Sequence, residues 1–213
     1  MIPKQFSSYS KLEYALRDDN TLLSFYKESP ILIAAPHHTV QGQIEMYNND
    51  NGIKFGDQNT GILALLIAQE LKANLIICAR PNHDPNKIEG QYTSLIREME
   101  ITHLVEIHTH WRFDKDGELA TDNDIEVSTG SKLYNGYAMH LASLLREGLS
   151  MNISGNFTNI YYKAKKTYSL KMCRKKGIIP FHLEFYKGLI DDEHIELRKK
   201  IANVVSDSLV KFI

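Results

Sequence analysis

The sequence predicts a three-layer α/β/α fold in which helices cover both faces of a mixed, mostly parallel central sheet. Two observations lead to this prediction. Short apolar runs alternate with helical segments along the whole chain, as in proteins whose parallel strands are joined by helices. The apolar runs are also continuous, which is typical of strands buried on both faces. The chain has 213 residues and no internal repeats or low-complexity tracts, so we expect a single domain over residues 1–213.

Five segments are predicted as strands of this sheet. In the first, five apolar residues precede Pro36, which lacks an N–H and is therefore expected to end the strand. In the third, Glu106, His108 and His110 alternate with apolar residues, and this side is too polar for an ordinary core face. The predicted strands are residues 31–36, 74–80, 103–111, 125–129 and 178–186.

Helices are predicted between and around these strands. Residues 61–72 are apolar on nearly every side, so this helix should be largely buried. Residues 39–56 are polar and rich in Asn and Gly, which indicates either a loop over the site or a small β excursion. The predicted helices are one or two short ones within residues 8–28, and residues 61–72, 88–100, 135–149, 163–176 and 191–213.

The composition argues against several classes of partner. Lys and Arg total 25 against 26 Asp and Glu, a net charge of -1, so we expect no nucleic-acid or membrane partner. The first residues lack the apolar region of a signal peptide, and no apolar run approaches about 20 residues, so we expect a cytoplasmic protein. Cys78 and Cys173 are expected to be free thiols. The pattern carries no information on oligomeric state.

Polar residues at the ends of the predicted strands suggest a metal site. Ligands of open α/β sheets bind beyond the carboxyl ends of the strands, where the chain offers His37 and His108, with Asp57 at the start of the buried helix. Two imidazoles and a carboxylate leave a fourth position for water, as in catalytic zinc sites, and such a water can attack a carbonyl. We therefore expect one Zn²⁺ per chain. The alternative for Asp57 is a helix N-cap, and His38 or His110 would be the next-best ligands.

Other polar residues are candidates for catalysis or substrate binding. Glu184 lies in an apolar strand, so either it is paired or its pKa is raised to suit a general base. Glu106 is placed to orient the imidazole of His108. The guanidinium of Arg80 could donate two parallel hydrogen bonds to a substrate carboxylate, or else Arg80 pairs with Asp84. The lysine-rich run 163–176 is either a solvated helix face or attracts an anionic substrate.

These residues, taken in order, resemble motifs of the N-formylglutamate amidohydrolase family. The matches span residues 31 to 186, and the most specific is the Arg-xxx-Asp-x-Asn element. They are Pro36-His37-His38-Thr39 for Pro-His-Ser-Gly, Asp57-Gln-Asn-Thr60 for the acidic helix start, Arg80-xxx-Asp84-x-Asn86-Lys87 for Arg-xxx-Asp-x-Asn-Arg, Glu106-Ile-His108-Thr109 for Asp-x-His-Ser, Asn156-Phe157 for the Asn-containing loop and Leu183-Glu184 for the late strand glutamate.

The resemblance implies a zinc-carboxypeptidase-like fold of the phosphorylase/hydrolase-like type and zinc-dependent hydrolysis of an amide or formamide. It assigns metal ligands, an acid/base residue and substrate-binding residues, to which His38 and His110 are added as neighbours of the site. The chain departs from the family pattern beside the metal, where His38 replaces a small residue. The implied roles are His37, Asp57 and His108 for metal, Glu184 for catalysis, and Arg80, Asn86 and Asn156 for substrate.

The sequence thus predicts a zinc-dependent hydrolase that cleaves a formamide, an acyl-amino acid or a short peptide carrying a carboxylate. Two alternatives remain open. Two histidines and a carboxylate also form the open site of non-haem iron oxygenases, so an iron dioxygenase is the second interpretation. The third is a catalytically degenerate family member that binds a ligand without turnover.

Overall fold

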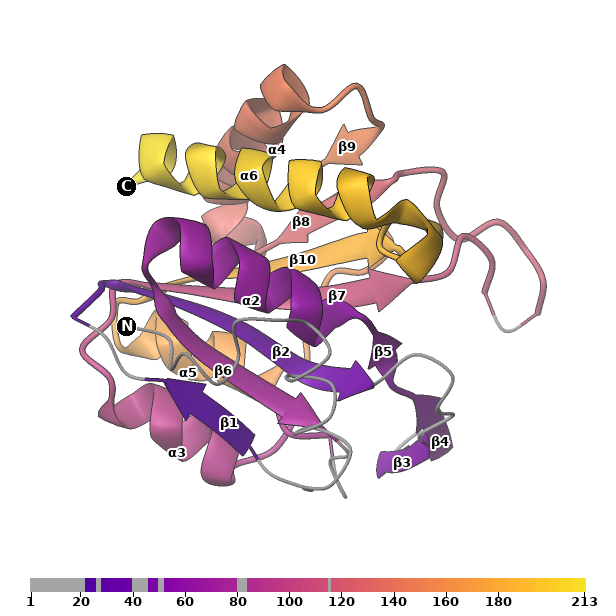
Figure 1. Ribbon diagram of the computed structural model, residues 1–213. Helices are drawn as coiled ribbons and strands as arrows, with labels where there is room; N and C mark the ends of the chain where they lie inside the picture. The colour runs from indigo at the N-terminus through magenta and orange to yellow at the C-terminus, as the bar shows by residue number, and fades with distance from the viewer. Residues whose placement is uncertain (1–21, 26–27, 40–45, 50–51, 80–83, 115) are drawn as a thin grey trace.

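The computed structural model describes residues 22–25, 28–39, 46–49, 52–79, 84–114 and 116–213. These residues form one large sheet with helices on both sides and a separate two-stranded hairpin (Figure 1). The strands of the sheet follow the order β1-β6-β2-β7-β10-β8-β9, and β5 pairs with β2. The strands are β1 (Leu22–Phe25), β2 (Ile31–Thr39), β3 (Met46–Asn49), β4 (Gly52–Phe55), β5 (Asp57–Gln58), β6 (Asn74–Ala79), β7 (His103–His110), β8 (Ile125–Ser128), β9 (Ile153–Ser154) and β10 (Ile179–Tyr186).

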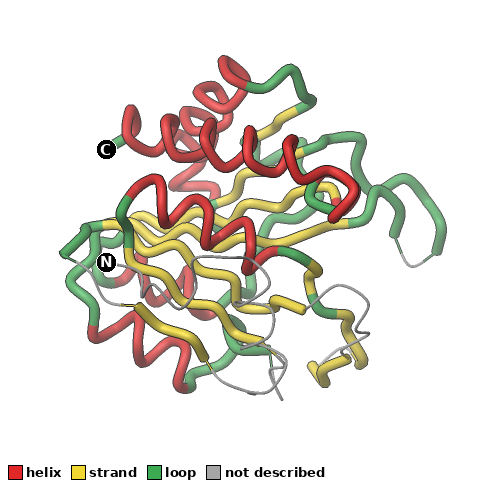
Figure 2. Tube along the Cα trace, viewed as in Figure 1, coloured by secondary structure: helices red, strands yellow, loops and turns green. Residues whose placement is uncertain are grey.

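Helices cover both faces of this sheet (Figure 2). On one face lie α2 (Thr60–Leu71), α4 (Asn135–Gly148) and α6 (Ile195–Phe212), and on the other lie α3 (Gln91–Glu98) and α5 (Tyr168–Lys175). Within the sheet, β1 and β8 run antiparallel to their neighbours β6 and β10, and the other pairs are parallel. The predicted three-layer fold with a mixed, mostly parallel sheet is confirmed.

Each face of the sheet buries its own apolar core. Ile33 and Val105 belong to the larger core under α2, α4 and α6. Their neighbours Leu32 and Leu104 belong to the smaller core under α3 and α5, because successive side chains of a strand point to opposite faces. The smaller core also holds both cysteines, which are buried free thiols as predicted. The residues two and four positions after Leu104 in β7 therefore face the α3 and α5 side.

The prediction that Pro36 ends the first strand is wrong. β2 continues to Thr39, and its pairing with β6 shifts after Ala35. Three steps along β2, from Ala35 to His38, correspond to two steps along β6. The strand thus contains one extra residue, a β-bulge, and a bulge tolerates a proline because it leaves one residue outside the ladder.

The bulge decides which way the two adjacent histidines face. Regular alternation would put His37 on the side of Ala35, towards α2, and His38 on the side of Ala34. The extra residue reverses this order. His37 contacts residues of the α3 and α5 side of the sheet, whereas His38 accepts a hydrogen bond from the backbone N–H of Gly61 in α2.

Two predicted helical segments are corrected. Residues 22–25 form β1, an edge strand paired with β6, and residues 8–21 and 26–27 lie outside the described residues. The run 163–176 is helical only from residue 168 onward. Before that point Ala164 adopts a left-handed φ of 49°, a conformation that interrupts a helix.

The segment 39–56 contains a β-hairpin, since its described residues include the antiparallel pair β3 and β4. Of the two interpretations of this segment, the small β excursion is therefore confirmed. A short strand, β9, precedes the loop that contains Asn156. Among the described residues, no helix is both long and apolar enough to cross a membrane.

Candidate metal centre

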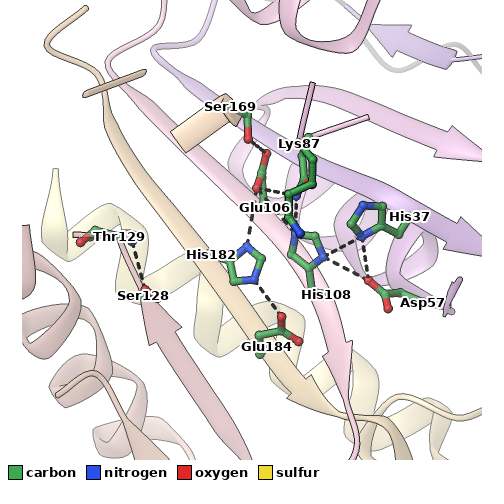
Figure 3. Close-up of polar contacts among 12 residues, drawn as sticks. His37, Asp57, Lys87, Glu106, His108, Ser128, Thr129, Ser169, His182 and Glu184 are labelled. Atoms are coloured by element: carbon green, nitrogen blue, oxygen red, sulfur yellow. Dashed lines mark hydrogen bonds and ion pairs between the residues drawn. The ribbon is translucent and has the colours of Figure 1, made fainter. Parts of the chain in front are cut away.

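Two histidines and an aspartate from three separate strands meet near the carboxyl end of the sheet (Figure 3). His37 comes from β2, His108 from β7 and Asp57 from the short strand β5, and all three are buried. Strands β2 and β7 are neighbours in the sheet, and β5 pairs with β2 at its carboxyl end. The site therefore depends on three strand ends that the parallel topology brings to one edge.

Three ligand atoms of this group lie almost equidistant from one another. The Nδ1 atoms of His37 and His108 are 3.2 Å apart. Oδ2 of Asp57 lies 3.4 Å from Nδ1 of His37 and 3.1 Å from Nδ1 of His108. A tetrahedral zinc with bonds of about 2.0–2.1 Å separates its ligand atoms by roughly 3.3 Å. The spacing of the three atoms therefore fits zinc, and a fourth position is left for water or substrate.

The opposite nitrogen of each imidazole faces a carboxylate. Nε2 of His37 lies 2.8 Å from Oδ1 of Asp84, and Nε2 of His108 lies 3.6 Å from Oε2 of Glu106. Histidine ligands of metals usually donate their outer N–H to a carboxylate in this way, which leaves the inner nitrogen as a lone pair for the ion. The hydrogen bond with Asp84 thus selects the tautomer that a metal requires at His37, and the nearby charge of Glu106 favours the same tautomer at His108.

Glu106 is fully buried and is the centre of a hydrogen-bond network. Its carboxylate accepts hydrogen bonds from the hydroxyls of Tyr92 (2.8 Å) and Ser169 (2.6 Å) and from the amide of Asn86 (3.2 Å). Burial by itself would raise the pKa of Glu106, but contacts with His108 and His182 outweigh this effect and hold the pKa well below its usual range. An ionised Glu106 then orients both imidazoles.

Glu106, His108 and His182 form a second group with the composition of a metal site. The rings of His108 and His182 pack against each other at a tilt, with centroids 4.0 Å apart and an interplanar angle of 34°. Their nitrogens come no closer than 3.6 Å to the carboxylate of Glu106, whereas the ligand atoms of the first group lie 3.1 to 3.4 Å apart. Since Glu106 is also saturated with other donors, the geometry favours a hydrogen-bond network here and a metal in the first group.

His182 lies between two carboxylates, as Figure 3 shows. Nε2 is 2.8 Å from Oε1 of Glu184, and Nδ1 is 3.6 Å from Oε2 of Glu106. Burial would lower the pKa of His182, but the two carboxylates prevail and raise it to about 9. Burial would conversely raise the pKa of Glu184, and His182 lowers it. Of the two alternatives for Glu184, the paired carboxylate is therefore the one that the structure shows.

Asp57 does not cap the buried helix. The N-cap position of α2 is Asn59, which has a left-handed φ of 62°. Burial would raise the pKa of Asp57, but hydrogen bonds from His108 and His37 hold it well below the usual range. Its second oxygen accepts a hydrogen bond from the Thr109 hydroxyl at 3.3 Å. The carboxylate is therefore ionised and held in place towards the two imidazoles.

A cavity of about 740 Å³ opens above this group. The three proposed ligands lie at its floor together with His182 and Glu184. One wall is the end of β7, including His110 and Trp111, and another is the irregular segment 161–167. The hydroxyl of Tyr162 donates a hydrogen bond to the backbone carbonyl of Trp111 at 2.9 Å, which joins these two walls. A volume of this size suits a small molecule or a short peptide.

Two predicted substrate-binding residues line the cavity. The ring of His110 packs against Tyr162, with centroids 5.1 Å apart. Asn86 is buried, and its amide group, besides contacting Glu106, lies 3.5 Å from Nε2 of His108. Asn86 thus helps to hold the carboxylate of Glu106 beside His108 at the same time as it borders the cavity.

Of three other predictions of substrate contact, two find no support among the described residues and the third, for Arg80, is not tested. His38 lies behind β2 and against α2, away from the cavity, and burial lowers its pKa to about 4 despite the opposing effect of Asp57. Asn156 does not border the cavity, because its side chain accepts hydrogen bonds within its own turn, from the backbone and hydroxyl of Thr158. Arg80 lies outside the described residues.

Sequence reasoning missed several residues of the site. Asp84 was considered as a partner of Arg80 and as part of the Arg-xxx-Asp-x-Asn element, but its contact with His37 was not predicted. Trp111 and Lys187 border the cavity and contact each other, with the Lys187 ammonium 4.5 Å from the ring centroid of Trp111. The only sequence signal for these two was their position immediately after strands β7 and β10.

Proteins of known structure share this architecture. N-formylglutamate amidohydrolase from Ralstonia eutropha JMP134 superimposes with a TM-score of 0.60 over 89% of this chain and 97% of that one, at 9% sequence identity. The chain shares the fold of N-formylglutamate amidohydrolase. The fold implied by the motif resemblance is therefore confirmed.

Two further structures have the N-formylglutamate amidohydrolase fold in common with this chain. The gene product Atu2144 from Agrobacterium tumefaciens has a TM-score of 0.62 and 14% identity, with coverage of 92% of this chain and 96% of that one. A bacteriophage poly-gamma-glutamate hydrolase has a TM-score of 0.53 and 9% identity, with coverage of 90% and 88%. No protein-family model and no curated protein matches the sequence.

Proposed function

We propose that the protein is a zinc-dependent hydrolase that cleaves an amide bond in a carboxylate-bearing substrate. The observation that carries the proposal is the triangle of ligand atoms from His37, Asp57 and His108, with edges of 3.1 to 3.4 Å, at the floor of an open cavity. The shared fold adds support, because two proteins that have it are named as an amidohydrolase and a poly-gamma-glutamate hydrolase.

A zinc ion at this position would polarise the scissile carbonyl and lower the pKa of a water molecule to about 7. Glu184 is the residue of the cavity floor that is suited to accept the proton of that water. His182 holds Oε1 of Glu184 at 2.8 Å, whereas Oε2 has no hydrogen-bond partner among the described residues. Glu184 is therefore oriented and ionised, and it has one oxygen available for a proton.

The charge of the cavity suits a substrate with a carboxylate. Its lining includes several lysines, whereas the lining carboxylates among the described residues, Asp57 and Glu184, are held by histidines at the floor. A substrate carboxylate would thus meet ammonium groups and no opposing free acid. N-formyl and N-acyl amino acids and short acidic peptides are the substrates to be tested first.

Metal analysis combined with a hydrolysis assay tests the proposal. The purified protein should hold about one zinc per chain and release amines from N-acyl-glutamates or glutamyl peptides. His37→Ala and His108→Ala should lose the metal. Glu184→Gln should keep it and lose roughly 10²–10⁴-fold in turnover, the usual contribution of general acid–base catalysis.

Other outcomes would contradict the proposal in distinct ways. Unchanged metal content in both histidine variants would show that the metal, if any, is bound elsewhere. Stoichiometric iron with oxygen consumption would instead support the dioxygenase alternative, which uses the same set of donors. Full turnover by Glu184→Gln would exclude this carboxylate as the proton acceptor.

A further inference from the structure

We propose that the segment 161–167, held to the sheet by the buried carboxylate of Glu126, is a recognition wall for an acidic peptide, so that the substrate carries several carboxylates rather than one. This inference rests on the proposed function, because the wall borders the cavity above the candidate metal centre. It concerns a different part of the site, and it can be tested independently of the metal.

The first observation is the charge of the cavity rim. Five lysines from three segments line the cavity, and Lys87 alone forms an ion pair with a described acid, 3.5 Å from Asp84. The others have no such partner among the described residues, although the whole chain has a net charge of only -1. The five residues are Lys87, Lys163, Lys165, Lys166 and Lys187.

Two of these lysines are held over aromatic rings, of which that of Trp111 lines the cavity. The ammonium of Lys187 lies 4.5 Å from the ring centroid of Trp111, and that of Lys165 lies 5.5 Å from the ring centroid of Phe157. Cation–π contacts of this kind restrict the side chain without neutralising its charge. The positive charge is therefore concentrated at the cavity.

The second observation is that the wall is anchored by a buried acid. Glu126 of β8 is fully buried, and its carboxylate accepts hydrogen bonds from the backbone N–H groups of Tyr161 (3.1 Å) and Tyr162 (2.8 Å). It also accepts hydrogen bonds from the side chains of Thr121 (2.6 Å) and Asn123 (3.0 Å). One carboxylate thus fixes the start of the lysine segment and the loop before β8.

The anchored wall lies beside β10, the strand that carries Glu184. Glu126 pairs in register with Glu184 across β8 and β10. Ser128, further along β8, donates a hydrogen bond to the backbone carbonyl of Lys163 at 2.8 Å. The lysine segment is therefore tied at several points to the strand next to Glu184, so its charges keep a defined position relative to the reacting centre.

The number and spread of the lysines indicate the chemical class of the ligand. Three of them lie within four consecutive residues, which span up to roughly 10 Å, and the others belong to two different segments. One carboxylate contacts only one or two ammonium groups, so this rim is suited to several acidic groups along a chain. An acidic peptide fits better than a nucleic acid, since the chain lacks the overall basic charge typical of nucleic-acid-binding domains.

Binding of labelled peptides tests the wall. Fluorescein-labelled hexaglutamate should bind more tightly than hexaglutamine, and its affinity should fall with increasing salt. Lys163→Gln/Lys165→Gln/Lys166→Gln should weaken hexaglutamate binding about tenfold, the combined effect of three partly exposed charge contacts. The matched control Lys132→Gln/Lys171→Gln/Lys175→Gln has the same change in net charge at exposed positions outside the cavity, and should bind within about twofold of the unsubstituted protein.

A single substitution tests the anchor. Glu126→Gln replaces one acceptor oxygen with an N–H₂ group, which cannot accept the N–H of both Tyr161 and Tyr162. We expect this variant to keep its zinc but to lose most of the preference for hexaglutamate over hexaglutamine and most of its salt dependence. A merely structural role would lower stability while leaving that preference unchanged.

The results separate the two proposals. Equal losses in the two lysine triple variants, equal affinity for hexaglutamine, or tighter binding of a hexanucleotide would overturn the acidic-peptide assignment, while zinc content and hydrolysis would still stand. Protein that lacks zinc and hydrolytic activity but binds hexaglutamate selectively would overturn the proposed function and leave the wall as a peptide-binding surface.

Discussion

Two buried clusters of similar composition lie side by side in this protein and share one residue. Each contains two histidines and a carboxylate, and His108 belongs to both. In the first cluster, with His37 and Asp57, the ligand atoms converge within 3.1 to 3.4 Å and border the cavity. In the second, with Glu106 and His182, the closest approaches to the carboxylate are 3.6 Å and the two rings are tilted by 34°.

The comparison shows that donor geometry, rather than residue type, distinguishes a metal centre from its support. The carboxylate of Glu106 is already occupied by hydroxyl donors and an amide, so an ion would have to displace them. The carboxylate of Asp57 is instead shared between two imidazole nitrogens. The second cluster therefore acts on the first by orienting its common histidine.

The largest expected difference is between His37→Ala and His182→Ala. His37→Ala removes one of three ligands, so zinc should fall below one tenth of an equivalent after gel filtration and hydrolysis should be lost. His182→Ala should retain most of its zinc, because the two nitrogens of His182 face Glu184 and Glu106 rather than the triangle of ligand atoms. Metal analysis of the two proteins side by side provides the measurement, and equal metal loss in both would remove the distinction between the clusters.

A smaller effect is expected for Glu106→Gln. The amide keeps the shape of the side chain but weakens the contact that orients His108. Loss of such an outer carboxylate typically lowers metal affinity 10–100-fold, and competition with a chromophoric chelator would measure it. The variant Glu98→Gln, on the exposed end of α3, serves as the control. An unchanged zinc affinity would show that Glu106 does not tune the metal centre.

Gly61→Ala tests the opposite face of β2. A Cβ at this position would lie 2.7 Å from the ring of His38 and 2.9 Å from the side chain of Ile77. Because both neighbours are buried, we expect a loss of about 1–3 kcal/mol in the free energy of unfolding, as for other overpacked cores. Zinc stoichiometry should stay unchanged, since His37 faces the other way. Urea denaturation measures the first quantity, and Gly136→Ala, in open space on α4, is the matched control.

The smallest effect is expected for Tyr92→Phe. This substitution removes one hydroxyl donor from Glu106, while Ser169 still donates to the same oxygen. A loss of about 1 kcal/mol in unfolding free energy is therefore expected. The double variant with Ser169→Ala should lose more than the sum of the two single changes, because it leaves that oxygen without a hydroxyl donor. Additive losses would argue against a shared network.

Much of the fold could be predicted from the sequence because each strand and helix has its own periodic pattern. The continuous apolar run of β6 and the alternation in β7 identified buried strands within one residue of their observed ends, and the apolar run of β2 identified where that strand begins. The Pro36 prediction failed because a bulge depends on pairing with a neighbouring strand, which a local pattern does not encode. The early part of 163–176 failed because its residues are held by contacts with β8 rather than by helical periodicity.

Part of the candidate site could be predicted from the sequence for the same reason. His37, Asp57 and His108 were found because each follows or lies within a segment with a clear pattern. The face on which His38 lies, and the turn that engages Asn156, depend on register and on contacts between segments distant in the chain. The contact between His37 and Asp84 could not be predicted either, since the two residues are 47 positions apart in the chain.

The sequence by itself determined the alternation of buried strands and helices and the set of polar residues at the strand ends, because hydrophobic periodicity is a local property. Tertiary structure decided which of these residues work together. The bulge at Pro36 turned His37 towards the cavity and His38 away from it, and strand order placed His108 beside both Asp57 and His182. Such choices arise from register and packing between segments far apart in the chain, and no short stretch of sequence specifies them.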